Sequence, residues 1–149
     1  MEIKTFIGRK LNYINGILRR QVEIDRHLKE RKNLQLTYEY YQEPKNILDF
    51  IAKRHVIYPL YSKRASETSQ KDSVNHITFQ YLGDLGYFLD ASKTMITCHD
   101  VFTFLTRGNL KRPWILQKFL LQGLKKCRYI IAISNFTKNE ITTKLNIPK

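Results

Sequence analysis

The sequence has little cysteine and no long uninterrupted apolar stretch, and each shortage excludes a class of protein. Only two of the 149 residues are cysteines, Cys98 and Cys127, so a disulfide framework is excluded. They lack a Cys-x-x-Cys spacing and therefore do not indicate zinc. No window approaches the roughly 18 apolar residues of a membrane-spanning helix, and the first residues lack the basic-then-apolar order of a signal peptide. We expect a cytoplasmic protein with two free, buried thiols.

Acidic residues are also scarce. The chain has 26 Lys and Arg against 13 Asp and Glu, a formal net charge of +13, and no acidic residue lies between Asp100 and Glu140. Such a field attracts polyanions, including nucleic acid, anionic lipid and phosphorylated substrates. Apolar residues make up 42% of the chain, which is typical of a globular protein, and the length suits one domain.

Apolar residues recur with periods that predict alternating strands and helices. We expect strands at residues 2–7, 34–40, 74–79, 94–98 and 129–133, with helices between them. The strand at 34–40 is expected at an edge, and the continuous apolar run at 129–133 is expected to be buried on both faces. Thr137 and Glu140 match a capping box, which predicts that the last helix begins there. This order predicts a single α/β domain, a Rossmann-like doubly wound parallel sheet with helices on both faces.

Ligands of such sheets bind beyond the carboxyl ends of the strands, so the residues that follow each strand are candidate site residues. Asn15 and Gly16 precede the long helix after the first strand, where free N–H groups attract phosphate. An Asn-Gly pair is as readily a plain turn, and no Gly-x-Gly-x-x-Gly indicates a dinucleotide site. His99 and Asp100 follow the fourth strand, and Ser134 follows the fifth.

Each of these polar residues also has a structural explanation. A lone histidine is more often hydrogen-bonded than catalytic, Asp100 could cap a turn, and Ser134 could cap the last helix. Cys98 and His99 are adjacent in a strand, so their side chains point to opposite faces and a thiolate–imidazole pair is disfavoured. The histidines at 27, 55 and 76 show no ligand spacing, and we expect neither a metal nor a cofactor.

The pieces of the last 75 residues follow one another in a distinctive order. An apolar strand leads into His99-Asp100, and a helix and a second apolar strand follow, then Ser-x-x-Thr-Lys from Ser134, a helix, and Asn-Ile-Pro at 146–148. This order resembles the N-terminal half of retaining GT-B glycosyltransferases of family 4. The first 40 residues resemble it more loosely, with Asn15-Gly16 before a long helix where the family has two glycines. Residues 44–73 match no part of that family.

The resemblance implies the acceptor-side domain of an enzyme that transfers a sugar, with retention, from a nucleotide-sugar donor to a sugar or lipid-linked acceptor. It implies that the catalytic His99 lies near the transferred sugar, Asn15 and Gly16 near the phosphates and acceptor, and Asp100 and Ser134 in the cleft wall. The family's C-terminal domain, which binds the nucleotide-sugar, is not in this chain. We therefore expect the chain to be inactive alone, with the donor domain supplied by a longer protein or by a partner chain.

The basic charge leaves two further interpretations open. A basic nucleic-acid-binding α/β module would use the charge, but no helix-turn-helix, zinc-finger or RNA-recognition signature accompanies it. Peripheral attachment to an anionic membrane is indicated within residues 44–64, where apolar residues are flanked by basic ones, with the basic tract after Asp100 expected to assist. The same apolar residues could equally pack on the sheet. The membrane-binding candidates are Lys53, Arg54, Lys63 and Arg64.

Overall fold

The structure is a computed structural model that describes residues 1–7, 16–31, 33–40, 46–68, 71–101 and 120–147. The strands are β1 (Glu2–Ile7), β2 (Gln35–Tyr40), β3 (Ser73–Ile77), β4 (Thr94–Cys98) and β5 (Tyr129–Ala132). The helices are α1 (Gly16–Lys29), α2 (Ile47–Ala52), α3 (Tyr58–Glu67) and α6 (Asn135–Lys144). A π-helix, η1 (Lys53–Ile57), joins α2 to α3, and two 3-10 helices, η2 (Gln80–Tyr87) and η3 (Ala91–Lys93), lie between β3 and β4. Residues 120–124 are also helical.

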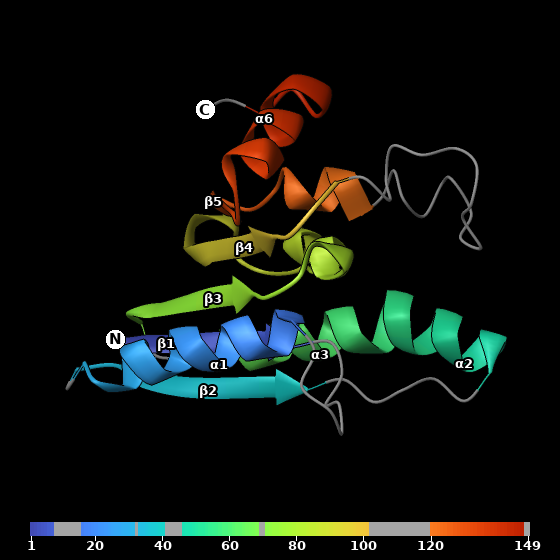
Figure 1. Cartoon of the computed structure of the whole chain (residues 1–149). Coiled ribbons are helices and arrows are strands. Elements are labelled where there is room, and N and C mark those ends of the chain that lie inside the picture. Colours follow the sequence, from blue (N-terminus) through green and yellow to red (C-terminus); the bar gives the residue numbers. More distant parts are fainter. Residues whose placement is uncertain (8–15, 32, 41–45, 69–70, 102–119, 148–149) are drawn as a thin grey trace.

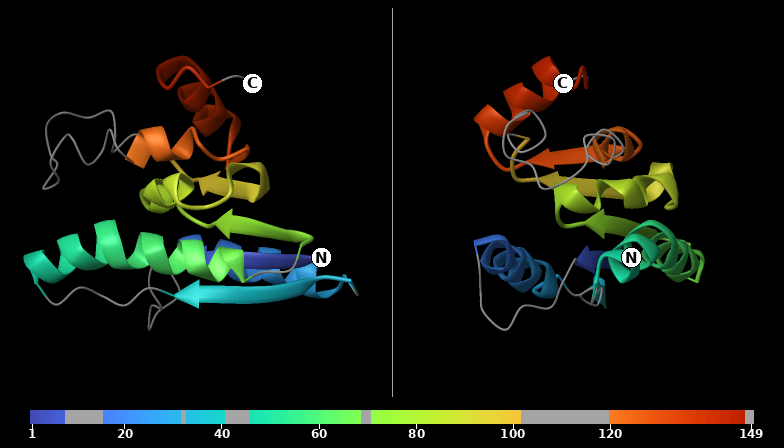
Figure 2. Two further views of the ribbon diagram at one scale, coloured as in Figure 1. Left: turned by 180° about the vertical axis from the view of Figure 1, so that it is seen from behind. Right: turned by 90° about the vertical axis from the view of Figure 1, so that its right-hand side faces the viewer.

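The five strands form one parallel sheet in the order β2-β1-β3-β4-β5 (Figure 1). Because β2 lies on one side of β1 and β3 on the other, the winding reverses between β1 and β3, as in doubly wound sheets. Helix α1 covers one face of the sheet, and the continuous segment α2–η1–α3 covers the other (Figure 2). The predicted fold class is therefore confirmed, and β2 lies at an edge as expected.

The hydrophobic core lies around the central strands. Phe6, Ile77 and Ile96 are in register on β1, β3 and β4, and all three side chains are fully buried. Residues of η2, of the helical residues 120–124 and of α6 complete the cluster against them. Its other buried members are Leu82, Leu85, Leu89, Cys98, Val101, Leu120, Leu124, Cys127, Ile141 and Leu145.

The backbone of η2 lies directly against the helical residues 120–124. A Cβ atom added to Gly83 would lie 2.5 Å from the Leu120 carbonyl oxygen, and one added to Gly86 would lie 2.3 Å from the Gly123 oxygen. Side-chain carbons do not approach backbone atoms so closely, so these positions require glycine for the close approach. The contact holds η2 against the helical residues 120–124.

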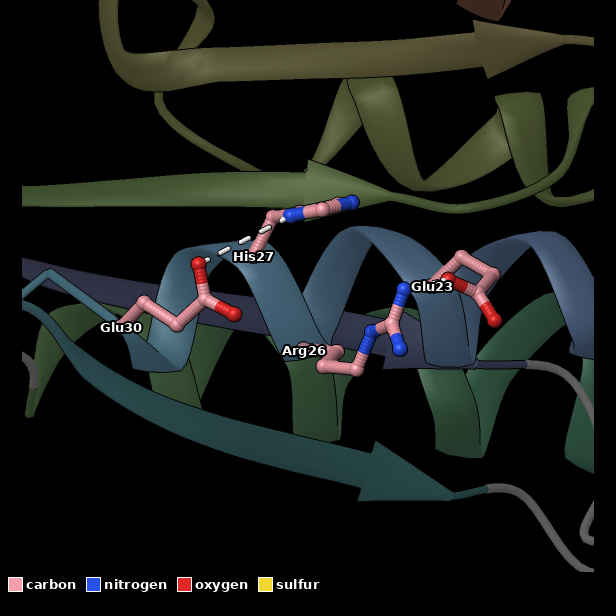
Figure 3. Close-up of polar contacts among 4 residues, drawn as sticks. All are labelled: Glu23, Arg26, His27 and Glu30. Atoms are coloured by element: carbon pink, nitrogen blue, oxygen red, sulfur yellow. Dashed lines mark ion pairs between the residues drawn. The ribbon is translucent and has the colours of Figure 1, made fainter.

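The outer face of α1 carries charged residues in the pattern usual for a solvent-facing helix (Figure 3). Arg26 pairs with Glu23 at 2.8 Å, and the His27 ring lies 3.8 Å from a carboxylate oxygen of Glu30, both three residues apart along the helix. All four side chains are exposed, so these pairs add little to stability but keep the surface hydrated.

Two predicted details of the C-terminal part are wrong. Strand β5 lies at the edge of the sheet, and Tyr129 and Ile131 are 56% and 42% exposed, so its run of apolar residues is not buried on both faces. Helix α6 begins at Asn135, two residues before the predicted cap at Thr137. The cap is Ser134, because its Oγ accepts a hydrogen bond from the Thr137 N–H at 3.1 Å.

Replacing Gly83 with alanine should destabilise the protein by about 2 kcal/mol or more, because the new methyl group overlaps the Leu120 carbonyl and must push the two backbones apart. Chemical denaturation measures this loss. Gly16→Ala is the matched control, since a Cβ there meets nothing within 4 Å. Equal stability of the two variants would contradict the close contact.

Protonation of His76 should destabilise the fold. Its ring is buried and shares a 2.9 Å hydrogen bond with Thr97, and burial lowers the pKa of His76 to about 4. The His76 ring binds a proton near pH 6.5 in the unfolded chain but only near pH 4 in the folded chain. The contribution of neutral His76 to the free energy of unfolding is therefore present above pH 6.5 and is lost as the pH falls toward 4. The stability of His76→Gln relative to the parent should therefore rise by about 3 kcal/mol between pH 7.5 and pH 4. A pH-independent difference in denaturation free energy would contradict this.

Candidate functional site

The carboxyl ends of the five parallel strands meet at one edge of the sheet, and the candidate residues lie beyond that edge. Gly16 begins α1 after β1, His99 and Asp100 follow β4, and Ser134 follows β5. Gly16 is exposed, with open space where a side chain would be. Asn15 lies outside the described residues. The winding of the sheet reverses between β1 and β3, and in such folds the ligand crevice lies beyond the strand ends at this reversal.

The chain leaving β3 holds His99. Thr78 binds back to β1, since its N–H and its Oγ both donate to the Phe6 carbonyl. The next contacts are to His99: its Nε2 lies 3.2 Å from the Thr78 carbonyl oxygen, and its ring packs edge-to-face on Phe79 with centroids 5.6 Å apart. Gln80 then accepts a hydrogen bond from the His99 main-chain N–H at 3.0 Å. His99 therefore lies beside the β1–β3 reversal.

The environment of His99 favours a neutral ring. Burial lowers the pKa of His99 below its usual value, the Thr78 carbonyl opposes this, Arg20 of α1 lowers it further, and Asp100 opposes it. A carbonyl oxygen only accepts hydrogen bonds, so Nε2 carries the proton of the neutral ring and Nδ1 is the acceptor. The influence of Arg20 also shows that the first turns of α1 lie close to His99.

The Asp100 carboxylate is half-buried beside His99. Its Oδ2 accepts a long, 3.5 Å hydrogen bond from the Gln80 amide, and its main-chain oxygen accepts one from the Cys98 thiol. Its Oδ1 is buried and has no hydrogen-bond partner within the described part of the chain. A buried carboxylate oxygen without a donor costs free energy.

The two cysteines are free and buried, as predicted. Burial and, to a smaller extent, the neighbouring Asp100 carboxylate raise the pKa of Cys98 to about 12. Burial alone raises the pKa of Cys127 to about 12. Neither thiol is a nucleophile at neutral pH, which agrees with the prediction that Cys98 and His99 do not act as a pair.

Ser134 has the structural role of a helix cap. Its Oγ accepts the Thr137 N–H and lies 3.0 Å from the Thr137 hydroxyl, which in turn donates to the His99 carbonyl oxygen at 3.1 Å. The start of α6 is thereby attached to the main chain of His99. An open groove of about 530 Å³ begins at Ser134 and continues past Asn135 and Lys138 along β5 and α6, without His99 among its lining residues.

The four basic residues predicted to bind membrane have different surroundings. Arg54 pairs with Asp84 of η2 at 2.8 Å, where the two side chains are 12% and 1% exposed, and it also donates to the Tyr81 carbonyl. Its charge faces inward, which differs from the prediction, because the buried Asp84 carboxylate requires a counter-charge. Lys53 pairs with Asp49 at 2.9 Å and is mostly buried. Lys63, paired weakly with Glu67 at 3.9 Å, and Arg64 are exposed.

The sequence pattern gave no site role to Thr78, Phe79 or Gln80 and indicated Thr137 only as a helix cap, although these four residues together hold His99. Their only signal was position, since Thr78 and Phe79 end the predicted strand at 74–79, Gln80 follows it, and Thr137 follows Ser134. A lone glutamine or threonine has no spacing that marks it as part of a site.

Within the described ranges, no three His, Cys, Asp or Glu residues are grouped so that they could hold a metal ion. No described helix is both long enough and apolar enough to cross a bilayer. Comparison of the chain with family models, with curated proteins and with solved structures finds no match.

Proposed function

We propose that the chain is the acceptor-side domain of a retaining glycosyltransferase of the GT-B type. The observation that carries the proposal is the position of His99, a neutral histidine beside the β1–β3 reversal of a doubly wound parallel sheet. The order of motifs around His99 and Ser134 supports the same function. The nucleotide-sugar is bound by a second domain, which closes on this edge of the sheet and completes the enzyme.

In this function His99 holds the reacting sugar. Its Nε2 is occupied by the Thr78 carbonyl, and Nδ1 accepts a hydrogen bond from a sugar hydroxyl. The Asp100 carboxylate, which is only partly buried, accepts a second hydroxyl. Gly16 at the start of α1 gives the acceptor close access to the backbone, together with Asn15. Ser134 acts indirectly. It caps α6 by accepting the Thr137 N–H, and the Thr137 hydroxyl donates to the His99 carbonyl oxygen.

Replacing His99 with alanine in the enzyme assembled with its donor domain should lower kcat roughly a hundredfold, because a group that contacts the reacting sugar is lost. Stability should fall by only about 1 kcal/mol, for the lost hydrogen bond to Thr78. Steady-state kinetics and thermal denaturation measure the two effects. His27→Ala, an exposed histidine of α1, is the control and should change neither.

A large loss of stability with kcat preserved would mean that His99 is a structural histidine and would overturn the proposal. The alternative function, a basic nucleic-acid-binding module, makes a different prediction. It requires salt-dependent retention of the chain on immobilised duplex DNA or RNA. Retention that persists in His99→Ala together with loss in basic-residue variants would favour that alternative.

We also propose that the domain attaches peripherally to an anionic membrane through α2–η1–α3. Six large apolar side chains of this segment are between 50% and 74% exposed, whereas the outer face of α1 is charged. Several large apolar side chains exposed along one helical segment indicate an interaction surface. The six residues are Leu48, Ile51, Val56, Ile57, Leu60 and Tyr61, which we call the apolar stripe.

Charge and position both favour a bilayer as the partner of the apolar stripe. Lys63 and Arg64 follow the stripe on α3, and the chain has a net charge of +13, which suits anionic headgroups. In the views of Figures 1 and 2, α2 projects beyond the carboxyl ends of the strands. A membrane bound there lies near the edge of the sheet that carries His99. An acceptor anchored in the membrane would therefore be within reach of the site.

The chain should co-sediment with vesicles of equimolar phosphatidylcholine and phosphatidylglycerol, and binding should weaken as salt is added. Each basic residue near an anionic surface contributes roughly 1 kcal/mol, so Lys63→Ser with Arg64→Ser should weaken binding roughly thirtyfold. Leu48→Ser with Leu60→Ser should weaken it as well, because the apolar stripe loses its most exposed residues.

Two controls match these variants. Lys29→Ser with Arg31→Ser removes the same charge from the exposed end of α1, on the other face of the sheet, and Phe136→Ser removes an exposed aromatic side chain from α6. Both should bind as the parent does. Equal binding to neutral vesicles, or no binding to anionic vesicles at low salt, would sink the membrane proposal.

A further inference from the structure

Gln80 is a long polar side chain in a fully buried position. It is the first residue of η2, directly after the exit of β3, and its exposed fraction is 0%. An amide costs free energy when it leaves water unless both its oxygen and its nitrogen find partners. An apolar residue of similar volume would fill the same space without that cost. The partners of the Gln80 amide therefore indicate why a glutamine is present.

Both ends of the Gln80 amide bind the His99-Asp100 pair. The His99 main-chain N–H can only donate, so it fixes Oε1 of Gln80 as its acceptor, at 3.0 Å. The NH2 group is then directed to Asp100 and donates to Oδ2 at 3.5 Å. One side chain thus spans the two residues that follow β4.

Gln80 belongs to a three-residue clamp, which we define as Thr78, Phe79 and Gln80. Thr78 binds the Nε2 of His99, Phe79 packs on the ring, and Gln80 holds the main chain. The contacts with Thr78 and Phe79 hold the ring at one nitrogen and one face. The ring can still move if the main chain at His99 rotates, and the hydrogen bond from the His99 N–H to Gln80 restricts that rotation.

The element that carries Gln80 is itself held on two sides. Gly83 and Gly86 lie against the backbone of the helical residues 120–124. On another side, Arg54 of η1 pairs with Asp84 and donates to the Tyr81 carbonyl. Tyr81 is the next residue after Gln80. A side chain placed at the start of such a fixed element can hold another group accurately.

We propose that Gln80 is a positioning residue, which orients His99 and the Asp100 carboxylate toward the ligand crevice. The orientation is a property of this chain and can be measured on it, whereas its importance for turnover rests on the proposed glycosyltransferase function. Gln80 does not contact the reacting atoms. It acts by keeping Nε2 of His99 on the Thr78 carbonyl, so that Nδ1 remains the acceptor, and by fixing one oxygen of Asp100.

The test compares three variants by NMR of the 149-residue chain. In the parent, the ring nitrogen shifts of His99 should report the Nε2–H form, and the His99 amide should exchange slowly. Gln80→Met removes both hydrogen bonds at similar volume, so it should mix the two ring forms and speed exchange of that amide about tenfold. Gln80→Glu keeps an acceptor for the His99 N–H, so that amide should still exchange close to the parent rate and the ring should keep the parent form. It replaces the NH2 group that donates to Asp100 with an oxygen, so only the hold on the Asp100 carboxylate should be lost.

The matched control is Asn75→Leu. Asn75 of β3 is an equally buried amide, but its side chain donates to Ser66 and to Thr94. This variant should lose stability while the His99 signals keep the parent pattern. If Gln80→Met lowers stability and leaves the His99 ring form and amide exchange unchanged, Gln80 has only a structural role and the proposal is wrong. Unaltered His99 signals in Gln80→Met overturn the proposal whether or not the stability changes.

A second readout uses the assembled enzyme. Gln80→Met should lower kcat about tenfold with little change in the KM of the donor, and it should have no further effect in a His99→Ala background. An additive loss in the double variant would show that Gln80 does not act through His99. If His99→Ala is fully active, the glycosyltransferase function fails, while the NMR result still decides whether Gln80 positions His99.

Discussion

The candidate site depends on the buried ion pair between Arg54 and Asp84, because this pair attaches η2 to the helices behind the sheet. The Asp84 side chain is 1% exposed, and burial raises its pKa to about 6 although Arg54 opposes the shift. At neutral pH the carboxylate is therefore charged within the protein and needs Arg54. Removing one member of such a pair costs about 3–5 kcal/mol, more than a typical surface contact by an order of magnitude. Since η2 begins with Gln80, any shift of η2 also moves the clamp on His99.

The π-helix explains how one segment can have an inward cation and an outward apolar stripe. In η1 the Tyr58 N–H donates to the carbonyl of Lys53, five residues earlier, so the turn holds one residue more than an α-helical turn. Val56, five residues after Ile51, therefore continues the exposed line, and Leu60 follows four residues later. Arg54, three residues after Ile51, would lie on that outer face in a regular α-helix. The wide turn brings it inward to Asp84.

The strands could be predicted from the sequence because their apolar periods are local. The ranges 2–7 and 94–98 agree with β1 and β4, and the parallel order followed from the alternation with helices. The partial exposure of β5 could not be predicted, because an apolar run has the same composition whether its strand lies at the edge of a sheet or between two other strands. The partner of Arg54 was equally hidden, because Asp84 is thirty residues away and the ion pair forms only when η2 packs on η1.

Two histidines of this sheet illustrate what decides the role of a residue. His76 and His99 are both neutral, and both share a hydrogen bond with a threonine, through the Thr97 hydroxyl and the Thr78 carbonyl. His76 lies inside β3, between β1 and β4, and its side chain is buried, so a ligand cannot reach it. His99 lies one residue beyond the end of β4, where the pairing of the strands has stopped and the residue is only partly buried. The chemistry of the two rings is the same, and the difference in access arises from a strand that ends at Cys98. A structural histidine thus requires only burial and one partner, whereas a ligand-binding histidine requires support from one side and access from the other. In the proposed role of His99, the clamp that follows β3 supplies the support and the carboxyl edge of the sheet supplies the access.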